Sequence, residues 1–360
     1  MTNRERIINT VLCKDVDRLP FFFNFGPWYE TVRRWNTEGL GAEKDWFADF
    51  GFDSGIALML DVNLGFFPQF EERIVADTGK TIIKYDYRGI LIEDRKDGCS
   101  IPKFIEHPVK TAEDWEKLKK ERLNPNDPGR FPENWATLAK EYNEGDQLVQ
   151  IGYYPYGLFG TLRDMMGVEE LLVSFYDQPE LIHEMMDYLT DFWIEIYKIA
   201  SKDVKIDCIH MWEDMSGKQG SLISPDMVRE FMMPNYKKIK AFADAYNIPI
   251  VSLDTDGNVS QLVPLFMECG INLIFPFEVA AGCDILEYRR KYPNLGILGG
   301  IDKQEIANGK EAIDKELERV APMFKQPGYI PSLDHLIHPE ISWEDFRYFV
   351  FRLKEIIGVK

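Results

Sequence analysis

The fold of this chain is decided by the stretch Val251-Ser-Leu-Asp254-Thr-Asp256-Gly257-Asn258, in which an apolar run ends in two carboxylates. A second stretch, Ser332-Leu-Asp-His335, ends an apolar run with an imidazole. Such runs are typical of parallel strands that are buried on both faces. In a barrel of alternating strands and helices, functional side chains gather where the strands end. The two stretches therefore predict an enzyme with a metal site or an acid/base site.

Short apolar runs recur along the chain, and longer amphipathic segments separate most of them. This alternation predicts an α/β protein, a single (β/α)8 TIM barrel that occupies residues 1–360. The eight predicted strands are Leu19–Phe25, Ser54–Leu60, Leu148–Tyr154, Asp207–Trp212, Pro249–Leu253, Asn272–Phe277, Gly296–Gly300 and Tyr329–Leu333. The clearest predicted helices are Pro179–Ala200, Pro225–Ala245, Gln261–Cys269 and Glu305–Phe324.

One segment departs from this alternation. Residues 81–94 contain two β-prone runs on either side of Tyr87-Arg-Gly, and this pattern predicts a β-hairpin. We expect the hairpin to be inserted after the second barrel strand.

Charge and cysteine content restrict the partners and the compartment. The chain has 60 acidic and 42 basic residues, and its net charge of −18 disfavours nucleic acid and anionic membranes as partners. Neither a signal peptide nor a membrane-spanning apolar run is recognisable. The five cysteines are scattered and form no Cys-x-x-Cys, which is typical of free thiols. We therefore expect a cytoplasmic protein, and a homodimer is compatible with the sequence.

Carboxylates are unusually frequent where the predicted strands end. Asp254 and Asp256 are two residues apart, so on a regular strand they would face the same side, and His335 would join them from another strand. These three side chains are the predicted metal ligands, for Zn²⁺ or a harder ion such as Mn²⁺ or Fe²⁺. The predicted catalytic residues are Asp254, Asp256, His335 and Glu213. The predicted substrate-binding residues are Asn24, Trp28, Tyr29, Tyr153, Tyr154 and Asp214.

The alternative interpretation is structural. Asp and Asn are preferred N-caps, so any single one of these carboxylates can serve only to begin the following helix. By the same reasoning His210, which lies inside an apolar run, is expected to be a hydrogen-bonded core residue.

Six motifs occur in an order that resembles the uroporphyrinogen decarboxylase superfamily over nearly the whole chain. The first, Arg4-Glu-Arg-Ile together with Asp17-Arg-Leu-Pro20, is similar to the start of the family. The others lie within Asp207–Tyr236, Asp256–Asn258, Gly270–Asp284, Leu298–Asp302 and Gly328–His335. The resemblance implies a (β/α)8 barrel, in agreement with the strand count.

The chain departs from true uroporphyrinogen decarboxylases near its first strand. There they carry Arg-Gln-Ala-Gly-Arg, whose arginines meet the carboxylates of the substrate. This chain has Phe23-Asn-Phe-Gly-Pro-Trp-Tyr-Glu30 instead, with no arginine before Arg33. The departure predicts that uroporphyrinogen is not the substrate.

The resemblance is closer to the methyltransferase branch, which transfers methyl groups to or from corrinoid proteins. Its thiol-methylating members bind zinc through His-x-Cys-Gly-Asn and a later Cys. In register, these ligands fall on Asp254, Asp256 and His335, and a downstream Glu-Asn falls on Glu344-Asp345. Carboxylates replace thiolates, which suits a substrate oxygen better than a substrate thiol.

We therefore expect a corrinoid-dependent methyltransferase of the O-demethylase type. It would move a methyl group from a small methoxylated or methylated substrate to a corrinoid protein that carries cobalamin. A uroporphyrinogen decarboxylase-like lyase and a non-catalytic ligand-binding barrel are the alternatives.

Overall fold

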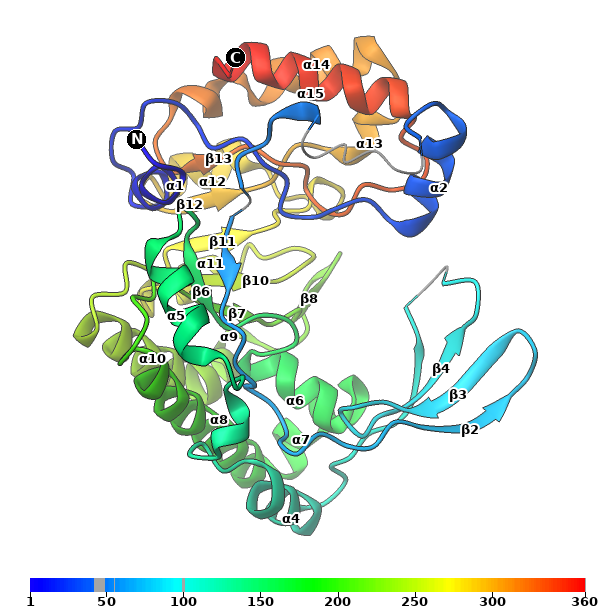
Figure 1. Cartoon of the computed structure of the whole chain (residues 1–360), viewed down its shortest axis with the longest axis vertical. Helices are drawn as coiled ribbons and strands as arrows, with labels where there is room; N and C mark the ends of the chain where they lie inside the picture. The colour runs from blue at the N-terminus through cyan, green and yellow to red at the C-terminus, as the bar shows by residue number, and fades with distance from the viewer. Residues whose placement is uncertain (42–48, 55, 99–100, 360) are drawn as a thin grey trace.

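A computed structural model describes residues 1–41, 49–54, 56–98 and 101–359. Its centre is a curled parallel sheet of seven strands in the order β1-β6-β7-β10-β11-β12-β13, with helices on its outer side (Figure 1). These strands are β1 (Leu58–Met59), β6 (Val149–Ile151), β7 (Cys208–Trp212), β10 (Ile250–Asp254), β11 (Leu273–Phe275), β12 (Gly296–Leu298) and β13 (Tyr329–Ile330). Seven of the eight predicted barrel strands are therefore present, all within predicted ranges except for Asp254.

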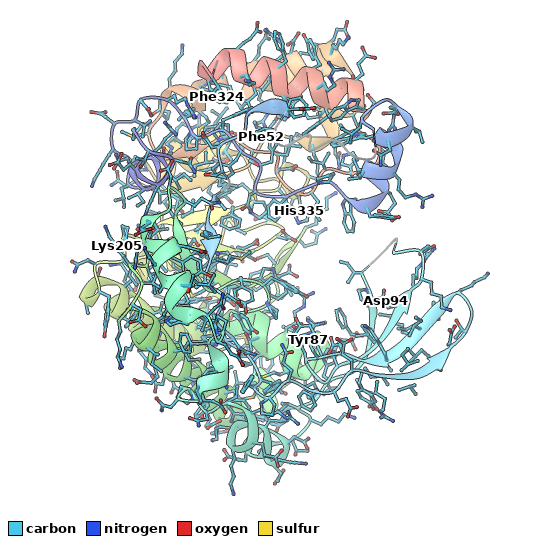
Figure 2. The ribbon with its side chains drawn as sticks, in the orientation of Figure 1. Phe52, Tyr87, Asp94, Lys205, Phe324 and His335 are labelled. Carbon is cyan, nitrogen blue, oxygen red and sulfur yellow. The ribbon has the colours of Figure 1, made fainter. Side chains whose placement is uncertain are left out.

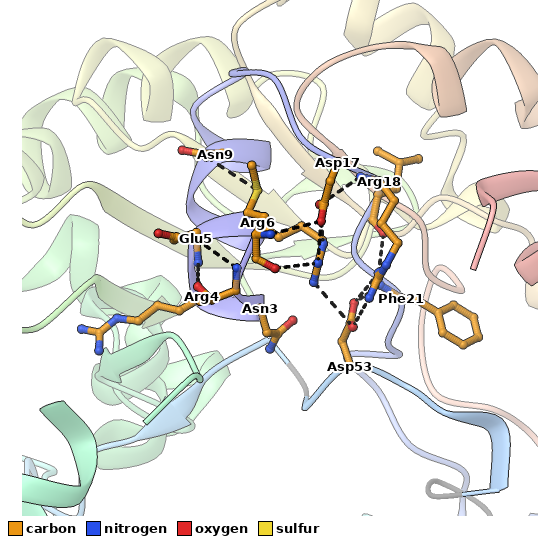
Figure 3. Close-up of polar contacts among 12 residues, drawn as sticks. Asn3, Arg4, Glu5, Arg6, Asn9, Asp17, Arg18, Phe21 and Asp53 are labelled. Atoms are coloured by element: carbon orange, nitrogen blue, oxygen red, sulfur yellow. Dashed lines mark hydrogen bonds and ion pairs between the residues drawn. The ribbon is translucent and has the colours of Figure 1, made fainter. Parts of the chain in front are cut away.

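The prediction of an eighth strand at Leu19–Phe25 was wrong for the described residues. This segment is extended, but it makes only scattered backbone hydrogen bonds with its neighbours. Phe21 exchanges two bonds of 2.8 Å with Asp53, one through the Asp53 backbone N–H and one through its carboxylate (Figure 3). At the other end, Pro27 forms an isolated parallel bridge with Ile337. The segment thus lies between β1 and β13 without the ladder that defines a strand.

Helices follow the strands and pack their apolar faces on the sheet. Predicted helix Pro179–Ala200 is confirmed as α8 with the same bounds. Predicted helix Pro225–Ala245 is divided by a π-helical turn, and predicted helix Glu305–Phe324 is interrupted at Gly309, whose φ is +88°. The helices are α1 (Asn3–Val11), α2 (Tyr29–Thr37), α4 (Ala112–Arg122), α5 (Trp135–Glu144), α6 (Leu158–Met166), α7 (Val168–Asp177), α8 (Pro179–Ala200), α9 (Pro225–Met227), α10 (Met233–Ala245), α11 (Val263–Glu268), α12 (Ile285–Lys291), α13 (Lys303–Ile306), α14 (Lys310–Val320) and α15 (Trp343–Ile357). Shorter helical turns are η1 (Pro128–Arg130), η2 (Val228–Met232), η3 (Val279–Ala281) and η4 (Ala321–Lys325).

Helix α1 closes the end of the barrel where the strands begin. Its residues Ile7 and Val11 pack with Phe22, Ile250 and Leu298 in one buried apolar cluster. Because this end is filled by side chains, the opposite end, where the strands finish, is the one open to a ligand.

The predicted hairpin is confirmed and is part of a larger antiparallel sheet, which we call the arm. The arm contains β2 (Arg73–Asp77), β3 (Thr81–Tyr85), β4 (Leu91–Arg95) and β5 (Lys103–Glu106), paired in that order. Figure 1 shows the arm projecting from the barrel beside α6 and α7. At its root, Arg88 pairs with Asp86 at 2.8 Å and with Asp164 of α6 at 2.5 Å.

No helix within the described ranges has both the length and the apolar character needed to cross a membrane. Four of the cysteines, Cys13, Cys208, Cys269 and Cys283, are free thiols as predicted, and Cys99 lies outside the described residues.

Candidate active site

The inward-facing side chains of β7 and β10 form the floor below the open end of the barrel. Alternation along β7 turns Cys208, His210 and Trp212 inward. The Nδ1 atom of His210 lies 2.9 Å from the hydroxyl of Ser252, and its ring stacks on Phe275. Burial lowers the pKa of His210 to about 4, so it is a neutral, hydrogen-bonded core residue, as the sequence predicts.

Above this floor, the structure brings Asp256 and His335 into contact. The Nε2 atom of His335 lies 3.2 Å from Oδ1 of Asp256. The ring of Phe25 stacks on the imidazole, with centroids 4.8 Å apart. Burial disfavours the imidazolium, but the hydrogen bond and charge of Asp256 outweigh burial and raise the pKa of His335. Figure 2 shows His335 on the side of the barrel that faces the arm.

Asp254 ends β10 and points into the same mouth, because it continues the inward register of Ile250 and Ser252. Its carboxyl makes no hydrogen bond or ion pair with any residue that the structure describes. Burial raises the pKa of Asp254 well above its usual range, and the neighbouring carboxylates of Asp256 and Asp214 raise it further. Burial therefore favours the protonated form of this carboxyl over the carboxylate.

Glu213, predicted to be catalytic, is fully buried. It accepts hydrogen bonds from the backbone N–H groups of Leu158, Phe159 and Gly160 at 2.9, 2.6 and 3.2 Å, and from the hydroxyl of Tyr236 at 2.7 Å. Burial raises the pKa of Glu213 to about 7, although the four hydrogen bonds favour the carboxylate and act to lower the pKa. These contacts satisfy the first turn of α6, so the side chain's evident role is to anchor that helix.

Asp214 adjoins Glu213 but points toward the arm. Its carboxylate and its carbonyl oxygen both bind Arg163 of α6, the latter at 2.9 Å. The guanidinium of Arg163 lies over the ring of Trp212, 5.8 Å from its centroid. Tyr154 packs edge-on against the same indole at 4.6 Å and accepts a bond from Arg88. Asp214 and Tyr154 thus share one wall with Trp212.

The other predicted substrate-binding residues are less closely grouped. The hydroxyl of Tyr153 donates a hydrogen bond to the carbonyl oxygen of Val62 at 3.2 Å, so this hydroxyl already has a partner within the fold. Tyr29 is 61% exposed, and its ring lies beside Arg33. Trp28 caps α2 and donates its backbone N–H to Ile337, while Asn24 is half-buried next to Phe25.

A cavity of about 730 Å³ opens beside this wall, between the arm and the corner that joins α6 to α7. Trp212, Tyr154 and Phe104 provide its aromatic surface, and Asp214 connects it to the mouth of the barrel. A hollow of about 970 Å³ between α15 and the segment after α2 is larger, but none of the residues that line it is at the end of a strand. We therefore regard the smaller cavity as the one related to the site.

The predicted metal ligands do not fit a metal as they are arranged. Within the described ranges, no group of three or more His, Cys, Asp or Glu side chains lies close enough to hold a metal ion. Asp256 and His335 instead pair with each other, and burial disfavours the Asp254 carboxylate that a metal would require. The metal site remains a prediction without support from this geometry.

Three residues of the site were not predicted from the sequence. Trp212 could have been found, because it follows Cys208 and His210 in the inward alternation of β7. Arg163 and Lys303 lie on helices and carry no local signal. Lys303 Nζ approaches Glu278 at 3.5 Å and Asp334 at 3.7 Å, and it is a cation within an otherwise acidic mouth.

The fold and the mouth together define an α/β barrel protein whose site is built at the strand ends. The family described as Uroporphyrinogen decarboxylase (URO-D) matches residues 89–356, and the chain therefore belongs to this family, as predicted.

Individual relatives are distant. Methylcobamide:CoM methyltransferase MtbA of Methanosarcina acetivorans is 25% identical over 240 residues, which are 63% of this chain and 68% of that protein. Uroporphyrinogen decarboxylase of Rhodococcus erythropolis is 22% identical over 250 residues, which are 66% of this chain and 66% of that protein. Among solved structures, a methyltransferase from Methanosarcina mazei covers 99% of both chains with a TM-score of 0.64 at 16% identity, which shows a shared fold.

Proposed function

We propose that the chain is a methyltransferase that removes a methyl group from a small methoxylated or methylated substrate and passes it to a corrinoid protein. The observation that carries the proposal is the Asp254 carboxyl, whose protonated form is favoured by burial and which makes no hydrogen bond or ion pair with the described residues. A departing alkoxide or phenoxide needs a proton, and a carboxylic acid poised in the mouth can give one. The name of the relative MtbA, a methylcobamide methyltransferase, supports the reaction class.

In the proposed step, the bond between the methyl carbon and the substrate oxygen breaks, and both bonding electrons stay on the oxygen. Asp254 gives this oxygen its proton, so the product leaves as a neutral alcohol or phenol. His335, whose imidazolium form is favoured by the contact with Asp256, stabilises the charge that develops on the oxygen. The reduced corrinoid of the partner protein accepts the methyl group, and Asp254 is reprotonated from water.

The wall beside the mouth favours a flat substrate. Trp212 and Tyr154 present aromatic faces and edges, and the cavity of about 730 Å³ leaves room for a ring next to Asp214. The proposed substrate contacts still include Asn24, Trp28, Tyr29 and Tyr153. Among the aromatic residues, Trp212 is proposed to make the main contact with the substrate. Glu213 is proposed to position the site through α6 and not to touch the substrate.

The acidic mouth argues against decarboxylation of a polycarboxylate. Asp214, Asp254 and Asp256 all lie at this end of the barrel, and Arg163 is already paired with Asp214. Binding several substrate carboxylates here would need unpaired cations, but Arg163, His335 and Lys303 each already pair with a carboxylate.

The test is transfer to cobalamin. Purified protein is mixed with cobalamin reduced to Co(I) and, separately, with a methoxybenzoate or an aliphatic methyl ether. We expect one of the donors to be demethylated while the Co(I) absorbance falls. Asp254→Asn, which keeps the shape but has no acidic proton to transfer, is the matched control. The proposal fails if this variant retains the wild-type rate, or if no donor is demethylated even when a methanogen corrinoid protein replaces free cobalamin.

A further inference from the structure

Lys303 occupies a central place among the loops that follow the last four strands. It is the first residue of α13, and its ammonium lies 3.5 Å from Glu278 and 3.7 Å from Asp334. The side chain of Lys303 is 15% exposed and that of Asp334 is 1% exposed, so water screens these ion pairs weakly. Glu278 follows β11, Lys303 follows β12 and Asp334 follows β13, so one ammonium connects three loops.

The Glu278 side of this connection leads to Asp256. Oε2 of Glu278 accepts the backbone N–H of Gly257 at 2.9 Å, and Oε1 is the atom that faces Lys303. Gly257 has a φ of +76°, and a Cβ there would lie 2.6 Å from the carbonyl oxygens of Ser216 and Gly217. The turn after Asp256 is therefore restrained on one side by the carbonyl oxygens of Ser216 and Gly217. On the other side it is restrained by the hydrogen bond from Gly257 to Glu278.

The Asp334 side of the connection leads to His335. Oδ2 of Asp334 accepts the N–H of Val279 at 2.9 Å, and Oδ1 accepts the N–H of Lys303 at 3.2 Å. His335 is the next residue in the chain. The position of the His335 side chain therefore depends on where Asp334 is held.

We propose that Lys303 is a positioning residue that holds the Asp256–His335 pair together by anchoring Glu278 and Asp334 with a single ammonium. Without this cation, two carboxylates would face each other in a weakly solvated site, and their repulsion would move the loops apart. Glu278 would then release Gly257, and Asp256 would no longer be held beside His335. The role of Lys303 in holding Asp256 beside His335 does not depend on the proposed function. The effect of Lys303 on methyl transfer does rest on the proposed function.

The test is a double-mutant cycle. The coupling free energy between Asp256→Asn and His335→Gln is measured by urea unfolding at one mildly acidic pH, in the native background and in Lys303→Met. We expect the coupling to fall by about half or more in Lys303→Met and to be retained in Lys303→Arg. A lysine that only stabilises the fold would lower the overall stability and leave the coupling unchanged. An unchanged coupling overturns the proposal.

Two further variants keep this test decisive. Lys310→Met removes an exposed lysine that pairs with Glu344 on the outer surface, and it must leave the coupling at its native value. Lys303→Gln replaces Lys303→Met if the latter does not fold, and native coupling in Lys303→Gln overturns the proposal as well. In kinetics, Lys303→Met should lower kcat with little change in KM, and Lys303→Arg should restore it. If the native protein transfers no methyl group, the proposed function fails, but the unfolding cycle still tests Lys303.

Discussion

Asp256 and His335 are in contact at 3.2 Å although they follow β10 and β13, which are separated in the sheet by β11 and β12. The curl of the sheet brings the loops after these strands toward each other across the mouth. The contact joins a carboxylate to an imidazole whose pKa is raised, and it lies beside Asp254, whose pKa burial raises. A carboxyl whose protonated form is favoured and an ion-paired imidazole therefore lie within one small region.

The first prediction concerns the titration of His335. Because Asp256 raises the pKa of His335, the change Asp256→Asn should lower it, as measured by NMR titration of the imidazole signals. His335→Gln identifies the signal. A pKa that does not change in Asp256→Asn would contradict the contact.

The same pair makes stability depend on pH. The folded-state pKa of His335 is raised, so its contribution is fully present below the ordinary histidine pKa and is lost as pH rises through the folded value. The decline in unfolding free energy over this window should be smaller in Asp256→Asn than in the native protein.

The second prediction concerns Asp254. Its folded-state pKa is raised, so the native protein should lose stability as pH rises from the ordinary aspartate pKa toward the folded value. Asp254→Asn cannot ionise and should be more stable than the native protein at alkaline pH. Its methyl-transfer rate should fall on the order of 10²-fold or more, because the general acid is lost. Thermal unfolding and rate measurements over a pH series check both effects. Equal midpoints at alkaline pH would show that Asp254 is not held neutral.

The third prediction concerns Glu213. Glu213→Gln replaces one acceptor oxygen by an amide that cannot accept the N–H groups of α6, and we expect it to cost about 2–4 kcal/mol of unfolding free energy. Ser224→Ala, which removes the ordinary cap of α9, is the comparison and should cost about 1 kcal/mol. Unfolding in urea measures both. A stable Glu213→Gln with no activity would instead support the original catalytic prediction for this residue.

The fourth prediction uses two glycines of one loop contact. Gly257→Ala should cost roughly 1–3 kcal/mol, because φ is +76° and the new Cβ meets two carbonyl oxygens at 2.6 Å. Gly217→Ala is the matched control, since a Cβ there has nothing within 4 Å, and it should stay within about 0.5 kcal/mol of the native protein. If both changes were equally mild, Gly257 would not restrain Asp256.

The fifth prediction concerns the alternative reaction. We expect no coproporphyrinogen when the protein is incubated with uroporphyrinogen, because residues 23–30 carry no arginine and the mouth is acidic. Chromatography of the oxidised porphyrins checks this, with an authentic uroporphyrinogen decarboxylase as the positive control. Formation of coproporphyrinogen would require a return to the lyase alternative.

Much of the barrel could be predicted from local pattern. The run ending at Asp254 and the helix Pro179–Ala200 carry strong periodicity, because one is buried on both faces and the other on one face. The segment Leu19–Phe25 has the same composition as a strand, but whether it pairs depends on the distance to its neighbours. The strands β2 and β5 of the arm were missed because their residues are exposed and lack a buried face.

The sequence by itself determined that carboxylates and an imidazole end the strands of this barrel, since strand ends and inward faces follow from a period of two. Only the tertiary structure decided what each of them does. Glu213 and Asp214 are neighbours in the chain, yet one is buried against the start of α6 and the other pairs with Arg163 at the cavity. The raised pKa of Asp254 and the pairing of Asp256 with His335 both depend on distances between loops that are remote in the chain. Those distances are set by the curl of the sheet and by contacts such as those of Lys303, which no local pattern records.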